Sequence, residues 1–243
     1  MSRPPRFSYA RAVHHVTLRC NNREFLFSVP SFELYLDILQ KARARFPLRL
    51  YNFCLMTNHV HLLCKVGRGD TLSAAMHWIS STFARRFNRL TSRWGHLWEG
   101  RFRSTIIEEN SYFFRCMAYL DLNPVRAKMA VTPLEYRWCG HRALRDEDTA
   151  ALDLHPLYLD CGTDAAARYR SYMNFLADEA TRPPASSLAT KYFVGTPHFV
   201  WRMEKRFGWA ESKDRLAAET RIGDDMSDVI CVGPKIGRTR PHN

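Results

Sequence analysis

The segment His59-Val60-His61 carries two imidazoles whose spacing could bind a metal ion. Residues i and i+2 of a strand face the same way, so both imidazoles would project from one face while Val60 and Leu62 point to the core. Two imidazoles on a rigid strand form a two-point clamp for a divalent cation, which needs a third ligand and open positions for substrate. Two outward histidines on an exposed sheet face can also be solvated and inert, so this pair alone is weak evidence.

Tyr119 and Asn123, in the segment YLDLNPVRA, form the second pair. In a continuous helix residues four apart share a face. Pro124 disfavours helical geometry at Asn123, so we expect the helix to end near Leu122 and Asn123 to cap a short new helix. An Asn side chain at such a break can still point toward a site. For Tyr119 the alternative is packing among the aromatic residues at 112–114.

Arginines and aromatic residues alternate between these two motifs. Cations contact phosphates, and exposed aromatic rings stack on bases, especially unpaired ones. The alternative is a solvated helix face with its aromatic residues in the core. The candidate DNA-binding residues are Arg85, Arg86, Arg89, Arg93, Arg101 and Arg103, and the aromatic residues among them are Trp94, Trp98 and Phe102.

Together these groups could perform phosphodiester chemistry. A cation held by His59, His61 and a neutral oxygen ligand would polarise the scissile phosphate and stabilise charge on the leaving side. Tyr119, placed in line, could attack phosphorus and remain covalently attached. Because the covalent link conserves the energy of the broken phosphodiester, such a site suits cutting and rejoining better than simple digestion.

Strand and helix patterns alternate along the first half of the chain and would position these residues. Their order, β-α-β-β-α-β-α, predicts an α+β domain with the split βαβ arrangement, an antiparallel sheet with helices on one face and an added helix that carries Tyr119. The expected elements are a strand at 12–20, a helix from a Ser31 cap to about residue 45, a hairpin of strands at 48–55 and 59–66, a helix from a Thr71 cap to about Leu90, a strand at 96–107 and a helix from a Ser111 cap to about Leu122.

Beyond residue 130 the pattern weakens. The expected features are a partly ordered connector at 133–145, a helix at about 165–179, a linker at 182–187, a small helical pair at about 186–209 and a basic flexible tail at 233–243. The chain is therefore divided into a main domain at 8–145, a helical C-terminal extension at 146–232 and the tail at 233–243.

The charge balance favours a polyanionic partner. Lys and Arg number 36 and Asp and Glu 24, which gives a net charge of +12. Nucleic acid is the first choice of partner and an anionic membrane surface the second. Hydrophobic residues at 46% and charged residues at 25% are typical of a globular chain.

The remaining composition indicates a cytoplasmic protein. No apolar run approaches the ~18 residues of a membrane span, and the N-terminal residues lack the apolar core of a secretory signal. The seven cysteines form no C-x-x-C pair, so we expect reduced and mostly packed thiols rather than a zinc ribbon or a disulfide framework.

Several segments resemble a known family. MTNHVHLL, at 56–63, resembles the His-hydrophobic-His motif of the HUH single-strand nucleases. Two further segments resemble the single-tyrosine transposases of the IS200-like class: TFARRFNRLTSRWGHLWEGRFRSTIIE and YLDLNPVRAKM. More narrowly, the chain is similar to the REP-associated tyrosine transposases, whose N-terminal strand is much like AVHHVTLRCNNRE. The resemblance covers roughly residues 8–145, and FVWRMEKRFGW also resembles the C-terminal part of that family.

The resemblance implies a ferredoxin-like fold and a transposase-type endonuclease that binds, cleaves and rejoins single-stranded DNA near palindromic hairpins. His59 and His61 would bind Mg²⁺ or Mn²⁺, and Asn123 would stand where relatives carry the third ligand, often Gln. Tyr119 would be the nucleophile that forms a 5′-phosphotyrosine. All four motif positions are present, with Asn for Gln as the one departure.

Two other functions stay open. A regulatory protein could hold hairpin DNA while its catalytic site stays unused, and a covalent protein–DNA adduct would distinguish the two. A small metallohydrolase would use His59 and His61 to activate water, and its cleavage of DNA would survive Tyr119→Phe. The chain lacks an H-E-x-x-H helix and clustered carboxylates, which disfavours this function. We expect a monomer or homodimer, and the role of residues 150–243 is open, although a basic tail could clamp the duplex stem of a hairpin.

Overall fold

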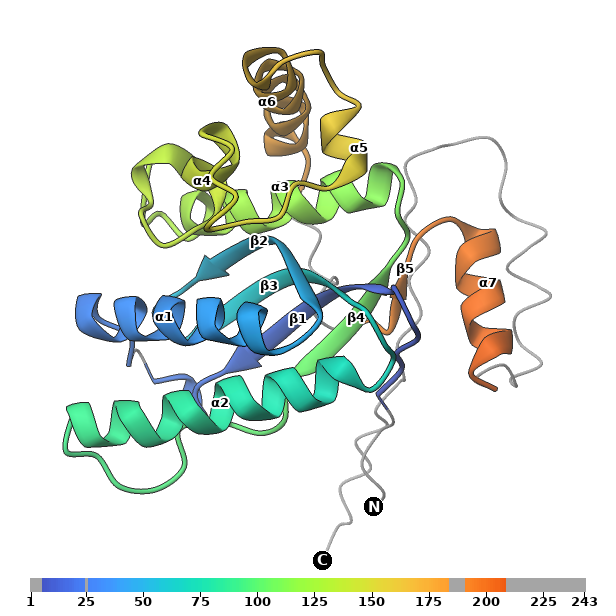
Figure 1. The fold of residues 1–243 in the computed structure, drawn as a ribbon. Coiled ribbons are helices and arrows are strands. Elements are labelled where there is room, and N and C mark those ends of the chain that lie inside the picture. The colour runs from blue at the N-terminus through green and yellow to red at the C-terminus, as the bar shows by residue number, and fades with distance from the viewer. Residues whose placement is uncertain (1–5, 25, 184–190, 209–243) are drawn as a thin grey trace, which may run out of the picture.

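The computed structural model describes residues 6–24, 26–183 and 191–208, which fold around one mixed sheet (Figure 1). The strands lie in the order β2-β3-β1-β4-β5. The first four pair in antiparallel fashion, and β5 pairs in parallel with β4. The strands are β1 (Val13–Arg19), β2 (Leu48–Leu55), β3 (His59–Val66), β4 (Arg103–Ile107) and β5 (Phe193–Val194).

The helices connect and cover these strands. With α1 and α2 as the connections, the strand order β2-β3-β1-β4 is the split βαβ arrangement, so the predicted α+β, ferredoxin-like fold is confirmed. The helices are α1 (Val29–Arg45), α2 (Thr71–Leu90), α3 (Ser111–Arg126), α4 (His141–Arg145), α5 (Pro156–Leu159), α6 (Ala165–Thr181) and α7 (Pro197–Arg206), and the short 3-10 helices are η1 (Asn21–Arg23) and η2 (Pro133–Glu135).

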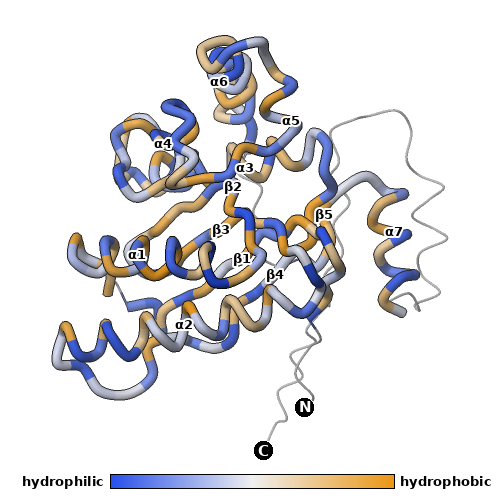
Figure 2. Tube along the Cα trace, viewed as in Figure 1, coloured by the Kyte–Doolittle hydropathy of each residue, from blue (hydrophilic) through white to orange (hydrophobic). Residues whose placement is uncertain are grey.

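Helices cover both faces of the sheet. In Figure 1, α1 and α2 lie side by side on one face, while α3 crosses the other face with α4, α5 and α6 beyond it. The buried side chains of Val60 and Leu62 belong to the first face, where the rings of Tyr35 and Phe83 join α1 to α2 with centroids 5.0 Å apart. Figure 2 shows hydrophobic stretches along the strands between these layers. The face opposite Val60 and Leu62, which carries the two histidines of β3, is therefore enclosed rather than open to solvent.

The helix beginnings differ from prediction in detail. The N-cap of α1 is Ser28 rather than Ser31, and the backbone N–H of Ser28 donates to Ser31 Oγ at 2.7 Å. Asn110 caps α3, because its side chain accepts a hydrogen bond from the backbone N–H of Tyr112 at 2.9 Å. A side-chain oxygen that satisfies these first N–H groups fixes where each helix begins.

The expected strand at 96–107 is wrong over its first half, because only Arg103–Ile107 form β4. The preceding residues form a loop bonded to the end of β1 instead of a strand. The backbone N–H of Asn21 donates to the carbonyl of Leu97 at 2.8 Å, and that of Glu99 to the carbonyl of Arg19 at 3.0 Å. These bonds satisfy the backbone of both segments at the end of the sheet.

The C-terminal expectations are met in part. The helix predicted at 165–179 is confirmed as α6, and the connector at 133–145 contains η2 and α4. Of the helical pair expected at 186–209, the described residues contain one helix, α7. The tail at 233–243 and most of the linker at 182–187 lie outside the described residues.

No described helix is long and apolar enough to cross a bilayer. Of the seven cysteines, the six in the described residues are free thiols, five of them buried, as predicted.

His14 lies on the α1–α2 side of β1 and is fully buried. Its Nδ1 lies 2.8 Å from Ser104 Oγ, and its Nε2 lies 3.1 Å from Ser8 Oγ. Burial lowers the pKa of His14 from 6.5 to about 3. Because the unfolded chain takes up this proton first, the stability contributed by neutral His14 is fully present above pH 6.5 and is lost as the pH falls toward 3.

We therefore expect His14→Gln to flatten the acid side of the stability curve by up to about 1.4 kcal/mol per pH unit. The check is urea unfolding with a chelator present, at several pH values between neutral and mildly acidic, comparing the slopes for the wild type and the variant. Equal slopes would show that His14 is protonated in the folded state.

Candidate active site

The register of three neighbouring strands brings the predicted histidines together with two arginines. On β1, Thr17 pairs with His61 of β3 and with Arg103 of β4, and Arg19 pairs with His59. Residues directly opposite each other in an antiparallel pair project from the same face. All five side chains therefore lie on the face that α3 covers.

Tyr119 of α3 meets the histidines on this face. Its ring lies 5.5 Å from that of His61 and 5.7 Å from that of His15, edge-on in both cases. Residues His15, His59, His61 and Tyr119 are called the His–Tyr cluster below. The structure thus brings together two motifs that the sequence presents separately.

His15 is a member of the cluster that sequence analysis did not select. It is fully buried, its ring stacks on that of His61, and its Nε2 lies 2.9 Å from His61 Nδ1. Thr17 Oγ1 lies 3.3 Å from the same nitrogen. Alternation along a strand at 12–20 puts His15, Thr17 and Arg19 on one face. Pairing that strand with the His59–His61 strand is the signal that would have shown the contact.

The two ring nitrogens of each predicted ligand have different surroundings. His61 Nδ1 contacts His15 and Thr17, whereas His61 Nε2 is buried without a hydrogen-bond partner. His59 Nδ1 lies 2.6 Å from Asn58 Oδ1, an acceptor to which it donates, so the lone pair stays on His59 Nε2. Metal-bound histidines are typically held through the second nitrogen in this way. The two Nε2 atoms therefore fit a metal ion.

Burial keeps both imidazoles neutral. It lowers the pKa of His61 well below its usual value, an effect to which His15, His59 and Arg19 add. It lowers the pKa of His59 to about 4, and Arg19 adds to this shift. The neutral imidazole is the form that binds metals. The described residues contain no group of three His, Cys, Asp or Glu that could hold a metal ion, so a third ligand among them would be of another kind.

Tyr119 is half-buried on α3, and burial raises the pKa of its hydroxyl, with the Asn123 side chain opposing the shift. At neutral pH the hydroxyl therefore carries its proton. Any reaction in which it attacks must remove that proton as the new bond forms.

The expected helix break at Asn123 is wrong. α3 runs through Pro124 to Arg126, and the backbone N–H of Ala127 donates to the carbonyl of Asn123 at 2.9 Å. Asn123 Nδ2 donates to the carbonyl of Tyr119 at 3.0 Å, so this amide binds its own helix instead of capping a new one. Tyr119 and Asn123 therefore stay on one face, as their spacing predicts for a continuous helix.

The predicted arginines divide between two layers. Arg85, Arg86 and Arg89 lie on the exposed side of α2, across the sheet from the His–Tyr cluster, and only Arg103 is on the cluster's own face. Arg101 is exposed just before β4. Within this group Arg86 pairs with Asp37 and Arg93 pairs with Glu24, each with an N–O distance of 3.1 Å.

Arg19 is a cation that the sequence analysis did not select. It is half-buried beside His59 and makes no ion pair with any described residue. Its position across from His59 places positive charge beside a predicted metal ligand.

Asp121 anchors the other side of α3, and it too was not predicted. Its fully buried carboxylate accepts hydrogen bonds from Asn52 Nδ2 at 2.8 Å and Tyr172 OH at 2.6 Å. It also accepts one from His141 Nδ1 at 2.8 Å, and His141 Nε2 lies 3.0 Å from Tyr169 OH. These bonds tie the helix of Tyr119 to β2, α4 and α6.

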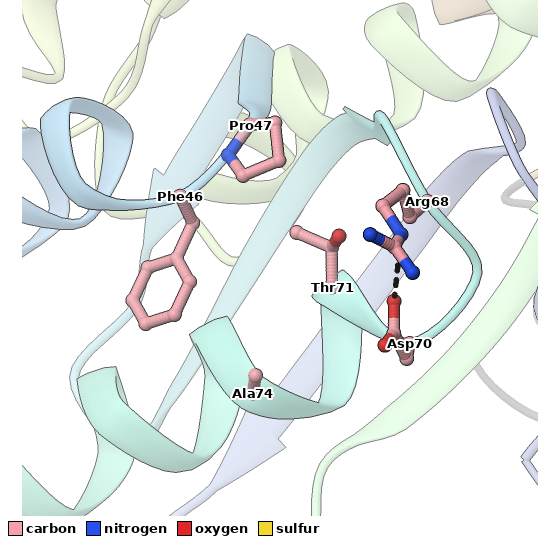
Figure 3. Close-up of a pocket in the computed structure, with 6 residues that line it drawn as sticks. All are labelled: Phe46, Pro47, Arg68, Asp70, Thr71 and Ala74. Carbon is pink, nitrogen blue, oxygen red and sulfur yellow. Dashed lines mark ion pairs between the residues drawn. The ribbon is translucent and has the colours of Figure 1, made fainter.

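A pocket of about 360 Å³ lies between the end of α1 and the start of α2, away from this cluster (Figure 3). Its charged groups are Arg68 and Asp70, paired at 3.9 Å. None of the predicted site residues lines it. The lining residues are Phe46, Pro47, Arg68, Asp70, Thr71 and Ala74.

One family and two solved structures match parts of this chain. Residues 8–121 match the family described as IS200-like transposases. A solved structure of a REP-associated tyrosine transposase bound to a REP hairpin matches with a TM-score of 0.53 and 17% identity, over 68% of this chain and 93% of that chain. A candidate transposase from Deinococcus radiodurans R1 matches with a TM-score of 0.36 and 17% identity, over 53% of this chain and 92% of that chain. Comparison with curated proteins gives no match.

Proposed function

We propose, from the premise that residues 8–121 match the IS200-like transposase family, that the protein cleaves and rejoins single-stranded DNA beside hairpins through a covalent Tyr119 intermediate. The observation that carries the proposal is the contact between the rings of Tyr119 and His61, whose Nε2 is buried without a partner. This contact places the ring of the proposed nucleophile against a histidine that has a ligand atom free. The related structure bound to a REP hairpin supports hairpin DNA as the partner.

His59 and His61 are the residues that would hold Mg²⁺ or Mn²⁺, through their Nε2 atoms, with Asn123 as the candidate third ligand. Bound there, the ion would supply a Lewis acid that polarises the scissile phosphate and stabilises charge on the leaving oxygen. His15, Thr17 and Asn58 orient the two imidazoles from behind.

Tyr119 would perform the covalent step. Its hydroxyl oxygen attacks phosphorus, the bond from phosphorus to the 3′ oxygen breaks, and the DNA 5′ phosphate becomes an ester of Tyr119. The phenolic proton is released and the departing 3′ oxygen takes up a proton, so charge and atoms balance. Attack by a 3′ hydroxyl on the phosphotyrosine reverses the step and joins two strands.

Arginines on both layers would hold the DNA backbone. Arg19 and Arg103 flank the His–Tyr cluster on its own face and would contact phosphates next to the cleaved bond. The remaining predicted cations would follow the strand away from the cluster. These are Arg85, Arg86, Arg89, Arg93 and Arg101.

The C-terminal helices would brace the catalytic helix. α6 contacts α3, and the Arg126 guanidinium donates to the carbonyl of Glu179 at 3.1 Å. We keep residues 146–232 as an extension that acts through this contact, in a monomer or homodimer.

A denaturing gel tests the proposed function. The protein is incubated with labelled hairpin DNA that has single-stranded flanks, taken from beside its own gene, with Mg²⁺ or Mn²⁺. A slow-migrating protein–DNA band that disappears with a chelator is the expected result. Binding without an adduct, across several hairpins and with both metals, would favour the regulatory hairpin-binding protein.

Replacing His61 with Ala should abolish cleavage and leave most single-strand binding intact, because the phosphate contacts come from arginines elsewhere. The expected loss of cleavage is at least ~100-fold, since even groups behind metal ligands contribute about 10–100-fold. The readouts are adduct yield and fluorescence anisotropy with labelled DNA, and exposed His77 on α2, changed to Ala, is the matched control. Parallel loss of binding and cleavage would contradict this separation of roles.

A further inference from the structure

Trp94 lies in the loop between α2 and β4, with its side chain in solvent. It is 93% exposed, the most exposed of the large hydrophobic side chains in the described residues. Its two aromatic neighbours are in different situations: Trp98 Nε1 donates to the carbonyl of Ser80 at 2.9 Å, and Phe102 is buried beneath the guanidinium of Arg6. Of the three aromatic residues among the arginines, only Trp94 offers both faces of its ring.

The loop holds Trp94 in a fixed backbone frame. The backbone N–H of Arg93 donates to the carbonyl of Asn88 at 2.9 Å, and Asn88 Nδ2 donates to the carbonyl of Gly95 at 3.0 Å. The Arg93 guanidinium bonds the carbonyl of His96 at 3.0 Å and pairs with Glu24. Gly95 has φ of +90°, which suits glycine at this turn. A ring presented in this way needs little ordering when it binds a partner.

The surroundings of the ring are positively charged. Arg85 and Arg89, on the exposed side of the last turns of α2, form no ion pair with any described residue. Arg101 is exposed further along the same connection. Single exposed apolar side chains are common. An exposed ring in the loop that follows Arg85 and Arg89 suits a polyanion with accessible π-faces, which is single-stranded nucleic acid.

The loop is bonded to the strand end that adjoins the His–Tyr cluster. Asn21 and Glu99 form the two backbone hydrogen bonds between this loop and the end of β1 that are described above. The backbones of Cys20 and Trp98 form an isolated antiparallel β-bridge. Arg19, at that end of β1, pairs with His59. In Figure 1, the chain after α2 returns toward the ends of β1 and β4. A strand that leaves the cluster past Arg19 therefore meets this loop.

We propose that Trp94 is a stacking platform for an unpaired base of the DNA strand whose phosphate lies at the His–Tyr cluster. The inference rests on the proposed function only in taking single-stranded DNA as the ligand. It adds a contact that reads the unpaired state of the strand, made by the loop that is bonded to the end of β1.

The test measures equilibrium binding without metal, so that cleavage cannot contribute. Fluorescence anisotropy is recorded for a labelled hairpin with single-stranded flanks and for a blunt duplex of the same stem. Trp94→Ala should weaken binding of the flanked hairpin by roughly 5- to 100-fold, the range that loss of one base–aromatic stack produces. Trp94→Phe should recover most of it, and the blunt duplex should bind the three proteins alike.

Trp201 supplies the matched control, because it is 47% exposed on α7 with Lys205 Nζ 4.5 Å from its ring centroid. Trp201→Ala should leave flanked-hairpin binding unchanged. Unchanged binding in Trp94→Ala, or an equal loss for hairpin and blunt duplex, would overturn the stacking role. The adduct assay separates the two proposals. If Trp94→Ala weakens binding but the wild type forms no adduct, the stacking role holds and the catalytic proposal fails. If the wild type forms the adduct but Trp94→Ala binds as the wild type does, the catalytic proposal holds and the stacking role fails.

Discussion

Tyr119→Phe should eliminate the covalent protein–DNA adduct and lower strand cleavage by roughly 10³-fold or more, as removal of a nucleophile does in enzymes with covalent intermediates. The substitution deletes one oxygen and keeps the ring, so the edge contacts with His15 and His61 stay in place. The half-buried site and the helix α3 should therefore fold as before. DNA binding should stay within about twofold, because the proposed phosphate contacts come from arginines.

The measurement is a single-turnover cleavage time course on a denaturing gel, with anisotropy for binding. Tyr112→Phe is the matched control, since Tyr112 is half-buried on the same helix and should not affect the adduct. Cleavage that persists in Tyr119→Phe would indicate a metal-activated water and remove the covalent step. Loss of cleavage together with binding would assign Tyr119 to the structure of the DNA-binding surface.

Local patterns predict the elements that hold the histidines. The strands of the hairpin, at 48–55 and 59–66, have the predicted bounds, because β-branched and aromatic runs around a short turn specify both strands. The helix predicted from a Thr71 cap ends at Leu90 as predicted, since its apolar residues recur at helical spacing, but its N-cap is Asp70 and Thr71 is its first residue. Elements whose signals are local in sequence were thus predictable.

Contacts between distant segments decide the rest. His15 and Arg19 became site residues only through the register of β1 against β3, which no single segment encodes. The sequence predicts a helix break before Pro124, yet α3 continues, with Leu122 and Pro124 both buried. Packing against the sheet and α6 outweighs the local preference of the proline.

Asp121 is the least predictable of these residues, because its partners come from positions 52, 141 and 172. A carboxylate that is fully buried is costly unless every acceptor position is satisfied. Here Asn52, Tyr172 and His141 supply three donors from three elements. The carboxylate therefore joins β2, α4 and α6 to α3, two residues from Tyr119.

Asp121→Ala should destabilise the protein by about 3–5 kcal/mol, because the donors of His141, Tyr172 and Asn52 would stay buried with no acceptor. Urea unfolding followed by circular dichroism measures the change. The control Asp178→Ala, at an exposed position on α6, should stay within about 0.5 kcal/mol of the wild type. A comparable small effect for Asp121→Ala would show that water or a side-chain shift replaces the lost acceptor.

The smaller change Tyr172→Phe separates the role of this network in stability from its role in the reaction. It removes one donor while the carboxylate keeps Asn52 and His141, so the loss of stability should be only about 1–2 kcal/mol and the protein stays folded. If the network fixes where α3 presents Tyr119, cleavage by the folded variant should fall about tenfold while hairpin binding does not change. If the variant cleaves DNA at the wild-type rate, the position of Tyr119 does not depend on the hydrogen bond from Tyr172 to Asp121. The hydrogen bonds to Asp121 would then contribute to stability alone.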